Sequence, residues 1–211
     1  MSGIVLCGGR SSRMGMPKAW LPFGDETMLQ RVVGRLLPVF DTLFVVAAPH
    51  QELPPLPRQV IVARDEREGR GPLEGIYAGL RAMPSGISAA YITGCDVPLI
   101  AVDFVRRMCG ELGSHDIAVP VDGEFHHPLA AVYRVSVLPA VAELLEADRL
   151  RPFFLFEQTD TRRVPVSDLR SIDAELNSLA NLNHPHEYAA ALRKAGLRIP
   201  PDIAKQFRLE S

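Results

Sequence analysis

The stretch Leu6-Cys7-Gly8-Gly9-Arg10-Ser11-Ser12-Arg13-Met14-Gly15-Met16-Pro17-Lys18 decides the fold, and it follows the apolar run Ile4-Val5 directly. A short buried strand that opens into paired glycines lets backbone N–H groups approach a polyanion closely, because no Cβ atoms stand in the way. Arg13 and Lys18 add positive charge to this loop. Lys18 is followed by Ala19 rather than Ser or Thr, and the loop has no GxGxxG, which excludes two common nucleotide motifs. The segment therefore predicts a strand and a loop that hold a nucleoside triphosphate.

Length and composition bound the class of protein. With 211 residues and 47% hydrophobic content, the chain can bury the core of one α/β domain. We assign this domain to residues 1–197 and expect a short tail over 198–211. The net charge of −2 and the pI near 6.3 give no reason to expect a nucleic-acid or membrane partner, because both reward a strong positive excess.

Cysteine usage indicates the compartment. Cys7, Cys95 and Cys109 have no metal-ligand spacing, and their odd number argues against a disulfide framework. This pattern favours a reducing cytoplasm. The sequence has neither a signal-peptide pattern nor an apolar segment of membrane-spanning length. We therefore expect a soluble, cytoplasmic protein.

Apolar, β-branched runs alternate with stretches of helical periodicity. The expected strands are 4–7, 43–48, 59–63, 89–93 and 116–120, and the expected helices are 27–40, 72–83 and 102–112. Asp25 is the expected cap of the first helix. Near-continuous apolar strands that alternate with helices require a mostly parallel sheet covered on both faces. We therefore predict a three-layer α/β/α Rossmann-like fold, with ligands at the carboxyl ends of the strands.

Asp96 lies in a second motif, Gly94-Cys95-Asp96-Val97-Pro98, directly after the expected strand 89–93. Its carboxylate can therefore meet the glycine-rich loop at one edge of the sheet. Phosphoryl-type transfer needs a divalent cation to screen the phosphate charge, and Mg²⁺ typically takes one or two protein carboxylates. We assign Asp96 as the Mg²⁺ ligand. The alternative is that Asp96 caps the helix that starts near Ala101, or forms an Asx turn before Pro98.

Two later segments carry further polar groups. In the segment 65–76, Pro72 would begin a helix whose free N–H groups suit a polar ligand. The charged side chains at 65–70 could otherwise form a solvated cluster. His126 and His127 are adjacent, and neighbours on a strand point to opposite faces, so a shared zinc site receives little support.

The segment Asn181-Leu182-Asn183-His184-Pro185 has two interpretations. Alternation would place Asn181 and Asn183 on one face, where their amides could hold a ring or a phosphate. Asn183 could instead cap a helix from residue 185 to about 197, which needs no ligand.

These motifs together resemble the molybdenum cofactor guanylyltransferases, within a wider superfamily of nucleotidyltransferases. The N-terminal signature Leu-x-Gly-Gly-x-Ser-x-Arg-Met-Gly-x-x-Lys is complete, with Cys7 where alanine is usual. Similar segments follow: Gly-Pro-Leu-x-Gly-Ile at 71–76, Cys-Asp-x-Pro at 95–98 and Pro-Leu-x-Ala-x-Tyr at 128–133. Asn-x-Asn-Thr-Pro matches 181–185, with His184 in place of Thr.

The resemblance implies a nucleotidyltransferase fold and a reaction in which the terminal phosphate of molybdenum-bound molybdopterin attacks the α-phosphorus of GTP. Mg²⁺ would be the cofactor, and GTP and molybdopterin the partners, with other cofactor-biosynthesis proteins as candidates. Leu6, Cys7, Gly8 and Gly9 would bind the nucleotide together with Lys18, Asp65 and Asp96. Arg13, Lys18 and Asp96 would be catalytic, with Asp96 on the metal. His127, Asn181 and Asn183 would contact the acceptor.

Two alternatives remain at this point. The first is a cytidylyltransferase with the same acceptor, or another nucleotidyltransferase that acts on a small-molecule phosphate. Gly8 favours guanine over cytosine, because cytidylyl relatives usually have Ala-Ala-Gly at positions 7–9. The second is a nucleotide sensor without turnover, against which Arg13, Lys18 and Asp96 together argue. The sequence Ala47-Ala48-Pro49 also lacks an asparagine that relatives often place there to contact the nucleotide.

Overall fold

A central eight-stranded sheet organises the protein, and the computed structural model describes residues 1–8, 14–65 and 69–208. The strand order is β10-β7-β9-β6-β1-β4-β5, with the short β8 paired to β7 and a separate β2-β3 hairpin. The strands are β1 (Ser2–Leu6), β2 (Pro22–Phe23), β3 (Glu26–Thr27), β4 (Leu43–Ala47), β5 (Val60–Arg64), β6 (Ala89–Gly94), β7 (Ile117–Asp122), β8 (Phe125–His126), β9 (Ala130–Arg134) and β10 (Thr161–Pro165).

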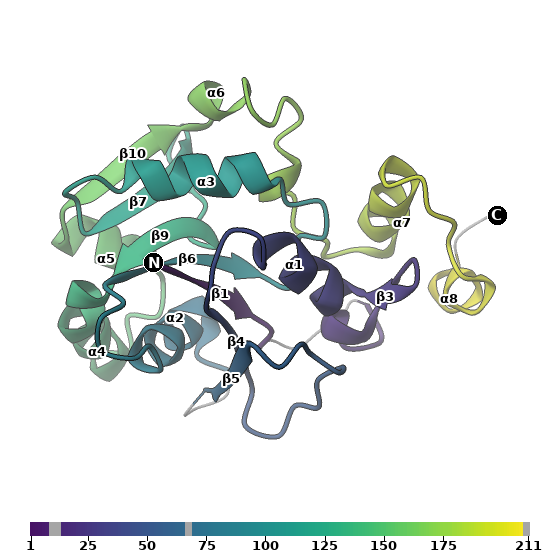
Figure 1. Cartoon of the computed structure of the whole chain (residues 1–211), viewed down its shortest axis with the longest axis horizontal. Coiled ribbons are helices and arrows are strands. Elements are labelled where there is room, and N and C mark those ends of the chain that lie inside the picture. Colours follow the sequence, from purple (N-terminus) through teal and green to yellow (C-terminus); the bar gives the residue numbers. More distant parts are fainter. Residues whose placement is uncertain (9–13, 66–68, 209–211) are drawn as a thin grey trace.

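Helices cover both faces of this sheet, which makes the three layers that Figure 1 shows. One buried cluster joins the sheet to α1, α3 and α6, and a second joins its other face to α2, α4 and α5. The α-helices are α1 (Met28–Leu36), α2 (Gly71–Arg81), α3 (Val102–Glu111), α4 (Leu138–Glu146), α5 (Phe153–Gln158), α6 (Val166–Leu169), α7 (Pro185–Lys194) and α8 (Pro201–Phe207). The predicted three-layer α/β/α fold is confirmed.

The order of the strands creates a ligand-binding edge. β1 pairs in parallel with both β4 and β6, and β4 with β5, whereas β9 runs antiparallel between β6 and β7. The chain passes from β1 outward to β4 and β5 and then returns to β6 on the other side of β1. Ligands of such sheets bind where the strand order reverses, outside the carboxyl ends of the strands. That point lies between Leu6 and Gly94, which are in register.

All five expected strands form, with small shifts at their ends. The three expected helices form as α1, α2 and α3, although α1 ends at Leu36, before the expected residue 40. Each is amphipathic and buries its apolar stripe against the sheet, as the helical periodicity predicts.

The predicted cap of α1 is wrong, and so is the alternative in which Asp96 caps α3. Thr27, not Asp25, caps α1: its side chain accepts a hydrogen bond from the Gln30 N–H, and the Gln30 side chain accepts one from the Thr27 N–H. Asp25 lies in the turn of the β2-β3 hairpin, so strand β3 separates it from the helix start. At α3, the Ala101 N–H donates to Ser178 Oγ at 2.9 Å. Asp96 therefore does not cap that helix.

The C-terminal helices build a third apolar cluster beside the β2-β3 hairpin. α7 contributes Tyr188 and Leu192, α8 contributes Ile203, and the N-terminal loop contributes Met14, all buried. Figure 1 places α7 and α8 at one end of the molecule. None of the helices in the described ranges combines the length and the apolar character that a membrane crossing needs.

Candidate functional site

A pocket of about 480 Å³ opens at the carboxyl ends of β1, β4 and β6, against the start of α2. This is the edge at which the topology predicts a ligand. Its lining residues are Leu6, Gly8, Val46, Asp65, Gly69, Arg70, Gly71, Pro72, Gly75, Gly94, Cys95, Asp96 and Leu129. The pocket thus brings together four of the segments that the sequence singled out, at 6–18, 65–76, 94–98 and 128–133.

Gly8 and Asp65 meet on one side of the pocket. The Asp65 N–H donates to the Ala47 carbonyl at 3.0 Å, which brings the end of β5 beside the end of β4. A Cβ atom built on Gly8 would lie 2.9 Å from Asp65 Oδ2. A side chain at position 8 would therefore displace the Asp65 carboxylate, so these two predicted nucleotide-binding residues depend on each other.

Lys18 and Asp96 form an ion pair on the other side. Lys18 Nζ donates to Asp96 Oδ2 at 2.7 Å, and the two side chains are 17% and 15% exposed. A Cβ atom built on Gly94 would stand 2.4 Å from Asp96 Oδ1. Any side chain at position 94 would therefore push this carboxylate out of its position. Charges this shielded interact more strongly than charges in bulk water.

Asn183 joins this ion pair. Its Oδ1 accepts a second hydrogen bond from Lys18 Nζ, also at 2.7 Å, although the two residues are 165 positions apart. The preceding Leu182 N–H donates to the Asp96 carbonyl at 2.9 Å. His184, not Asn183, is the N-terminal cap of α7, so the capping interpretation of Asn183 is wrong. Asn181 is exposed.

Leu6 and Cys7 support the floor of the site. Leu6 lines the pocket, while the Cys7 N–H donates to the Val46 carbonyl and the Cys95 N–H donates to the Leu6 carbonyl. Burial raises the pKa of the Cys7 thiol well above its usual range, and a hydrogen bond with Cys95 raises it further. Cys7 is therefore a protonated, structural thiol rather than a nucleophile.

The residues present fit a magnesium ion. Asp96 and Asp65 line the same pocket, and Mg²⁺ binds through one or two carboxylates together with phosphate oxygens and water. Within the described ranges, no group of three or more His, Cys, Asp or Glu side chains could hold a metal alone. The donor set suits a metal that arrives with a phosphorylated substrate.

Gln51 and Arg70 are two polar residues that the sequence analysis missed or left undecided. Gln51 Oε1 accepts from the Ala48 N–H, and its Nε2 donates to the Cys7 carbonyl, both at 3.2 Å. A side-chain amide thus bridges β1 and β4 where Ala47-Ala48-Pro49 lacks one. Arg70 is only 16% exposed and donates to the Leu145 carbonyl, so it is not part of a solvated cluster.

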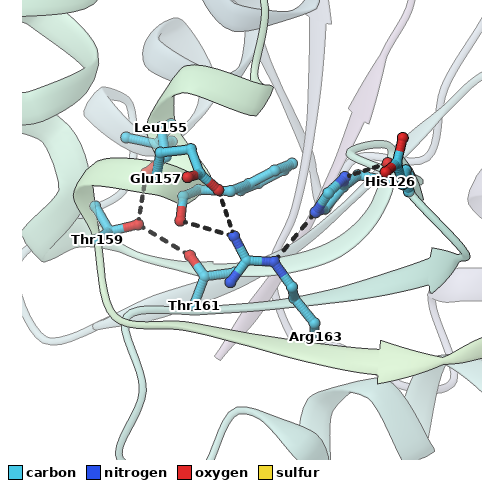
Figure 2. Close-up of polar contacts among 8 residues, drawn as sticks. His126, Leu155, Glu157, Thr159, Thr161 and Arg163 are labelled. Atoms are coloured by element: carbon cyan, nitrogen blue, oxygen red, sulfur yellow. Dashed lines mark hydrogen bonds and ion pairs between the residues drawn. The ribbon is translucent and has the colours of Figure 1, made fainter.

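The two histidines lie away from the pocket lining. The His127 N–H donates to the Pro120 carbonyl at 2.9 Å, and its ring packs edge-on against Phe125. Burial lowers the pKa of His127. His126 stacks on Phe156. Its ring nitrogen also accepts a hydrogen bond from Arg163, whose guanidinium binds Glu157 on α5, as Figure 2 shows. The two rings thus have different partners. Gly9 and Arg13, predicted to bind phosphate, lie outside the described residues.

Comparisons with known proteins identify the family and the fold. A protein from Mycobacterium ulcerans described as a probable molybdenum cofactor guanylyltransferase is 37% identical over 190 residues, covering 88% of this chain and 92% of the relative. The solved structure of molybdopterin-guanine dinucleotide biosynthesis protein A from Archaeoglobus fulgidus is similar, with a TM-score of 0.77 and 22% identity, over 93% of this chain and 99% of that one.

The fold extends to enzymes with another base. The structure of 2-C-methyl-D-erythritol 4-phosphate cytidylyltransferase from Thermus thermophilus has a TM-score of 0.65 at 15% identity, over 92% of this chain and 98% of that one. The fold alone therefore does not select the nucleotide. The family model described as the MobA-like NTP transferase domain matches residues 3–162. The chain belongs to the MobA-like NTP transferase family.

Proposed function

We propose that this protein is an Mg²⁺-dependent guanylyltransferase that transfers GMP from GTP to molybdenum-bound molybdopterin and releases pyrophosphate. The observation that carries the proposal is the Lys18–Asp96 ion pair, 2.7 Å long and shielded from solvent beside a pocket at the switch point of the sheet. A nucleotide-binding module without turnover would need no such pair of opposite charges.

The pocket and the charged residues of the N-terminal loop support the following roles in the reaction. The backbone at Gly8 approaches the phosphates closely because no side chain intervenes. Lys18 stabilises negative charge on the transferred phosphate and on the leaving pyrophosphate, and Arg13 adds a second cation. The acceptor phosphate is already anionic, so the protein orients the reactants and stabilises charge rather than activating a nucleophile.

Asp96 would hold the magnesium ion, with Asp65 in the same pocket. A bound Mg²⁺ would screen the phosphate charges that repel the incoming acceptor. The Lys18 ammonium occupies one oxygen of Asp96, and the second oxygen lies over Gly94.

The choice of guanine rests on Gly8 and Asp65. The missing Cβ at position 8 leaves the Asp65 carboxylate at the pocket wall. A carboxylate there can accept two hydrogen bonds from a single partner, which suits the donors of a ribose or of a guanine. The relative that is 37% identical is described as a probable molybdenum cofactor guanylyltransferase, which supports the choice of guanine.

The hydrogen bond between Asn183 and Lys18 supports an acceptor site next to Asn183. Its amide contacts Lys18, so an acceptor phosphate brought to Asn183 would lie beside the nucleotide phosphates. Asn181 and His127 remain proposed contacts for the rest of the acceptor. The free state of all three cysteines supports a reducing cytoplasm as the compartment.

Thermal unfolding with nucleotides tests the proposal first. The protein is melted with GTP, CTP, ATP or UTP, each with and without Mg²⁺. Ligand at about a hundred times its dissociation constant stabilises by roughly 2.7 kcal/mol. Selective stabilisation by GTP with Mg²⁺ is the expected result, followed by pyrophosphate release when molybdenum-bound molybdopterin is added. Preference for CTP would assign the chain to the cytidylyl enzymes, and no response to any nucleotide would contradict catalysis.

A further inference from the structure

Glu187, in the first turn of α7, holds the backbone that carries Asn183. Its Oε2 accepts hydrogen bonds from the Asn183 N–H at 2.6 Å and from the His184 N–H at 2.9 Å. A carboxylate that accepts from the cap and the residue before it fixes the entry into a helix. Glu187 lies outside the pocket lining, and nothing in the reaction requires it to touch a substrate.

The backbone is also fixed on the other side of Asn183. The Leu182 N–H donates to the Asp96 carbonyl at 2.9 Å. Asn183 thus lies between one anchor on the residue that would bind the metal and another on Glu187. With both neighbours held, the Asn183 side chain has few directions available, and it reaches Lys18 Nζ at 2.7 Å.

Glu187 itself stands on a firmly docked helix. The next residue, Tyr188, is fully buried and donates its hydroxyl to the Pro22 carbonyl. Leu192, one turn later, belongs to the buried cluster that contains Met14. α7 is therefore packed against the same N-terminal segment, 14–23, from which Lys18 projects.

The charge of Glu187 suits this task. Burial alone would raise the pKa of Glu187, but the N–H groups of Asn183 and His184 and the nearby imidazoles of His184 and His186 hold it below its usual range. The carboxylate is therefore ionised at neutral pH. Hydrogen bonds to an ionised acceptor are shorter and stronger than those between neutral groups.

We infer that Glu187 is a positioning residue: by fixing the backbone at Asn183, it makes the Asn183 amide hold the Lys18 ammonium beside Asp96. The inference rests on the proposed function for its catalytic meaning, although the geometry it describes belongs to the unliganded protein. Lysine has a flexible four-carbon stem and a compact charge, so its position depends on such neighbours.

A double-mutant cycle on unfolding tests the coupling without any substrate. Urea unfolding is measured for wild type, Glu187→Ala, Lys18→Met and the double variant. Residues in one hydrogen-bond network are coupled, whereas independent sites add. We expect Glu187→Ala to raise the unfolding equilibrium constant of the wild-type background. In the Lys18→Met background, the factor by which it rises should be at least about threefold smaller. The same cost in both backgrounds would overturn the inference.

Glu175→Ala is the matched control for this cycle. Glu175 accepts from Lys194 Nζ at 2.7 Å at the other end of α7, so its removal loosens the same helix without touching Asn183. Its effect on unfolding should be independent of Lys18→Met. Coupling of equal size for Glu175 would show that the helix as a whole is responsible, which would also overturn the specific role of Glu187.

Kinetics of GMP transfer provide the second readout. Outer partners that orient an active-site group typically contribute about 10–100-fold. Glu187→Ala should therefore lower kcat/KM for GTP by about tenfold, with no further loss in the Lys18→Met background. Glu187→Gln should restore most of it, because glutamine also accepts in a capping box. Additive losses would overturn the inference, whereas coupling in unfolding without any GMP transfer by wild type would overturn only the proposed function.

Discussion

Lys18–Asp96 and Arg163–Glu157 are ion pairs of the same length, 2.7 Å between nitrogen and oxygen, in different surroundings. The side chains of the first pair are 17% and 15% exposed, and those of the second are 43% and 53% exposed. Exposed pairs contribute little because water and salt screen them, while shielded charges act strongly on whatever binds beside them. Contact distance therefore does not distinguish a shielded pair beside the pocket from an exposed surface pair.

The neighbours of the two pairs differ as well. Lys18 also binds Asn183, and Asp96 lines the pocket. Arg163 lies between His126 on β8 and Glu157 on α5, as Figure 2 shows, and none of these three residues lines the pocket. The first network joins the two ends of the chain around a cavity, whereas the second ties neighbouring surface elements together.

The largest effect is expected from Asp96→Asn. This change keeps the shape of the side chain but removes the charge that pairs with Lys18 and would hold the metal. Transfer of GMP should fall by about 10²–10³-fold, the scale known for preorganised charge stabilisers. Pyrophosphate release under saturating GTP and Mg²⁺ is the measurement. Glu157→Gln is the control, and near-normal turnover in Asp96→Asn would refute the metal assignment.

Gly8→Ala should have the next largest effect. The new Cβ would lie 2.9 Å from Asp65 Oδ2, so the carboxylate must move from its place at the pocket wall. We expect roughly a tenfold loss of kcat/KM for GTP, as for one misplaced methyl group in a specificity pocket. CTP competition assays would measure any change of preference.

Gly34→Ala is the matched control for Gly8→Ala. A Cβ at Gly34 meets no atom within 4 Å, and the residue lies inside α1. Alanine there should leave kinetics unchanged and stabilise the protein by up to about 1 kcal/mol, because glycine disfavours helix. If both variants lost GTP selectivity equally, the Gly8–Asp65 contact would not be the cause.

Glu111 tests whether burial alone affects function, because its side chain is shielded but is not among the residues that line the pocket. Its side chain is 9% exposed and binds Arg107 and Arg162, each at 2.6 Å. Glu111→Gln should cost about 1–3 kcal/mol in urea unfolding, the range for hydrogen bonds to charged groups, with unchanged GMP transfer. If the folded Glu111→Gln variant lost GMP transfer, then the burial of a charged pair, rather than its place at the pocket, would decide whether the pair affects the reaction.

The dependence of the protein's stability on acidic pH also tests Glu111. Burial alone would raise the pKa of Glu111, but Arg162 and Arg107 hold it below its usual range. The unfolded chain then binds the proton more readily, so this stabilisation is present above the unfolded pKa of about 4.3 and disappears as pH falls through the lower folded value. Wild type should therefore lose more stability below pH 4 than Glu111→Gln. Parallel curves would contradict the ionised bridge.

The sequence predicted that Asp96 and the glycine-rich loop meet at one edge of the sheet, and the contact between Lys18 and Asp96 confirms this. Buried parallel strands appear as apolar runs, and Asp96 and the loop before Lys18 follow two of them, so their meeting is a consequence of topology. The hydrogen bond between Lys18 and Asn183 was not predictable, because it depends on how α7 docks across 165 positions. Alternation placed Asn183 on a face, but no periodicity states which distant residue faces it.

Other misses have similar causes. The cap of α1 is Thr27 rather than Asp25 because Asp25 lies in the turn of a two-stranded hairpin, and such short strands leave little pattern. β10 has only one buried residue, Val164, so its sequence lacks the apolar run that marked the central strands. The partners of the Gln51 side chain are backbone groups, which no residue pattern in the sequence identifies.

Glu157→Gln should have the smallest effect, and it completes the comparison. Removing the charge weakens one exposed ion pair with Arg163, which keeps its contact with His126. Unfolding free energy should fall by less than about 1 kcal/mol, and this small loss should shrink further in high salt because exposed charges are screened. GMP transfer should equal that of wild type. A loss approaching that of Asp96→Asn would mean that the surface network around Arg163 reaches the site, and the contrast drawn from burial would fail.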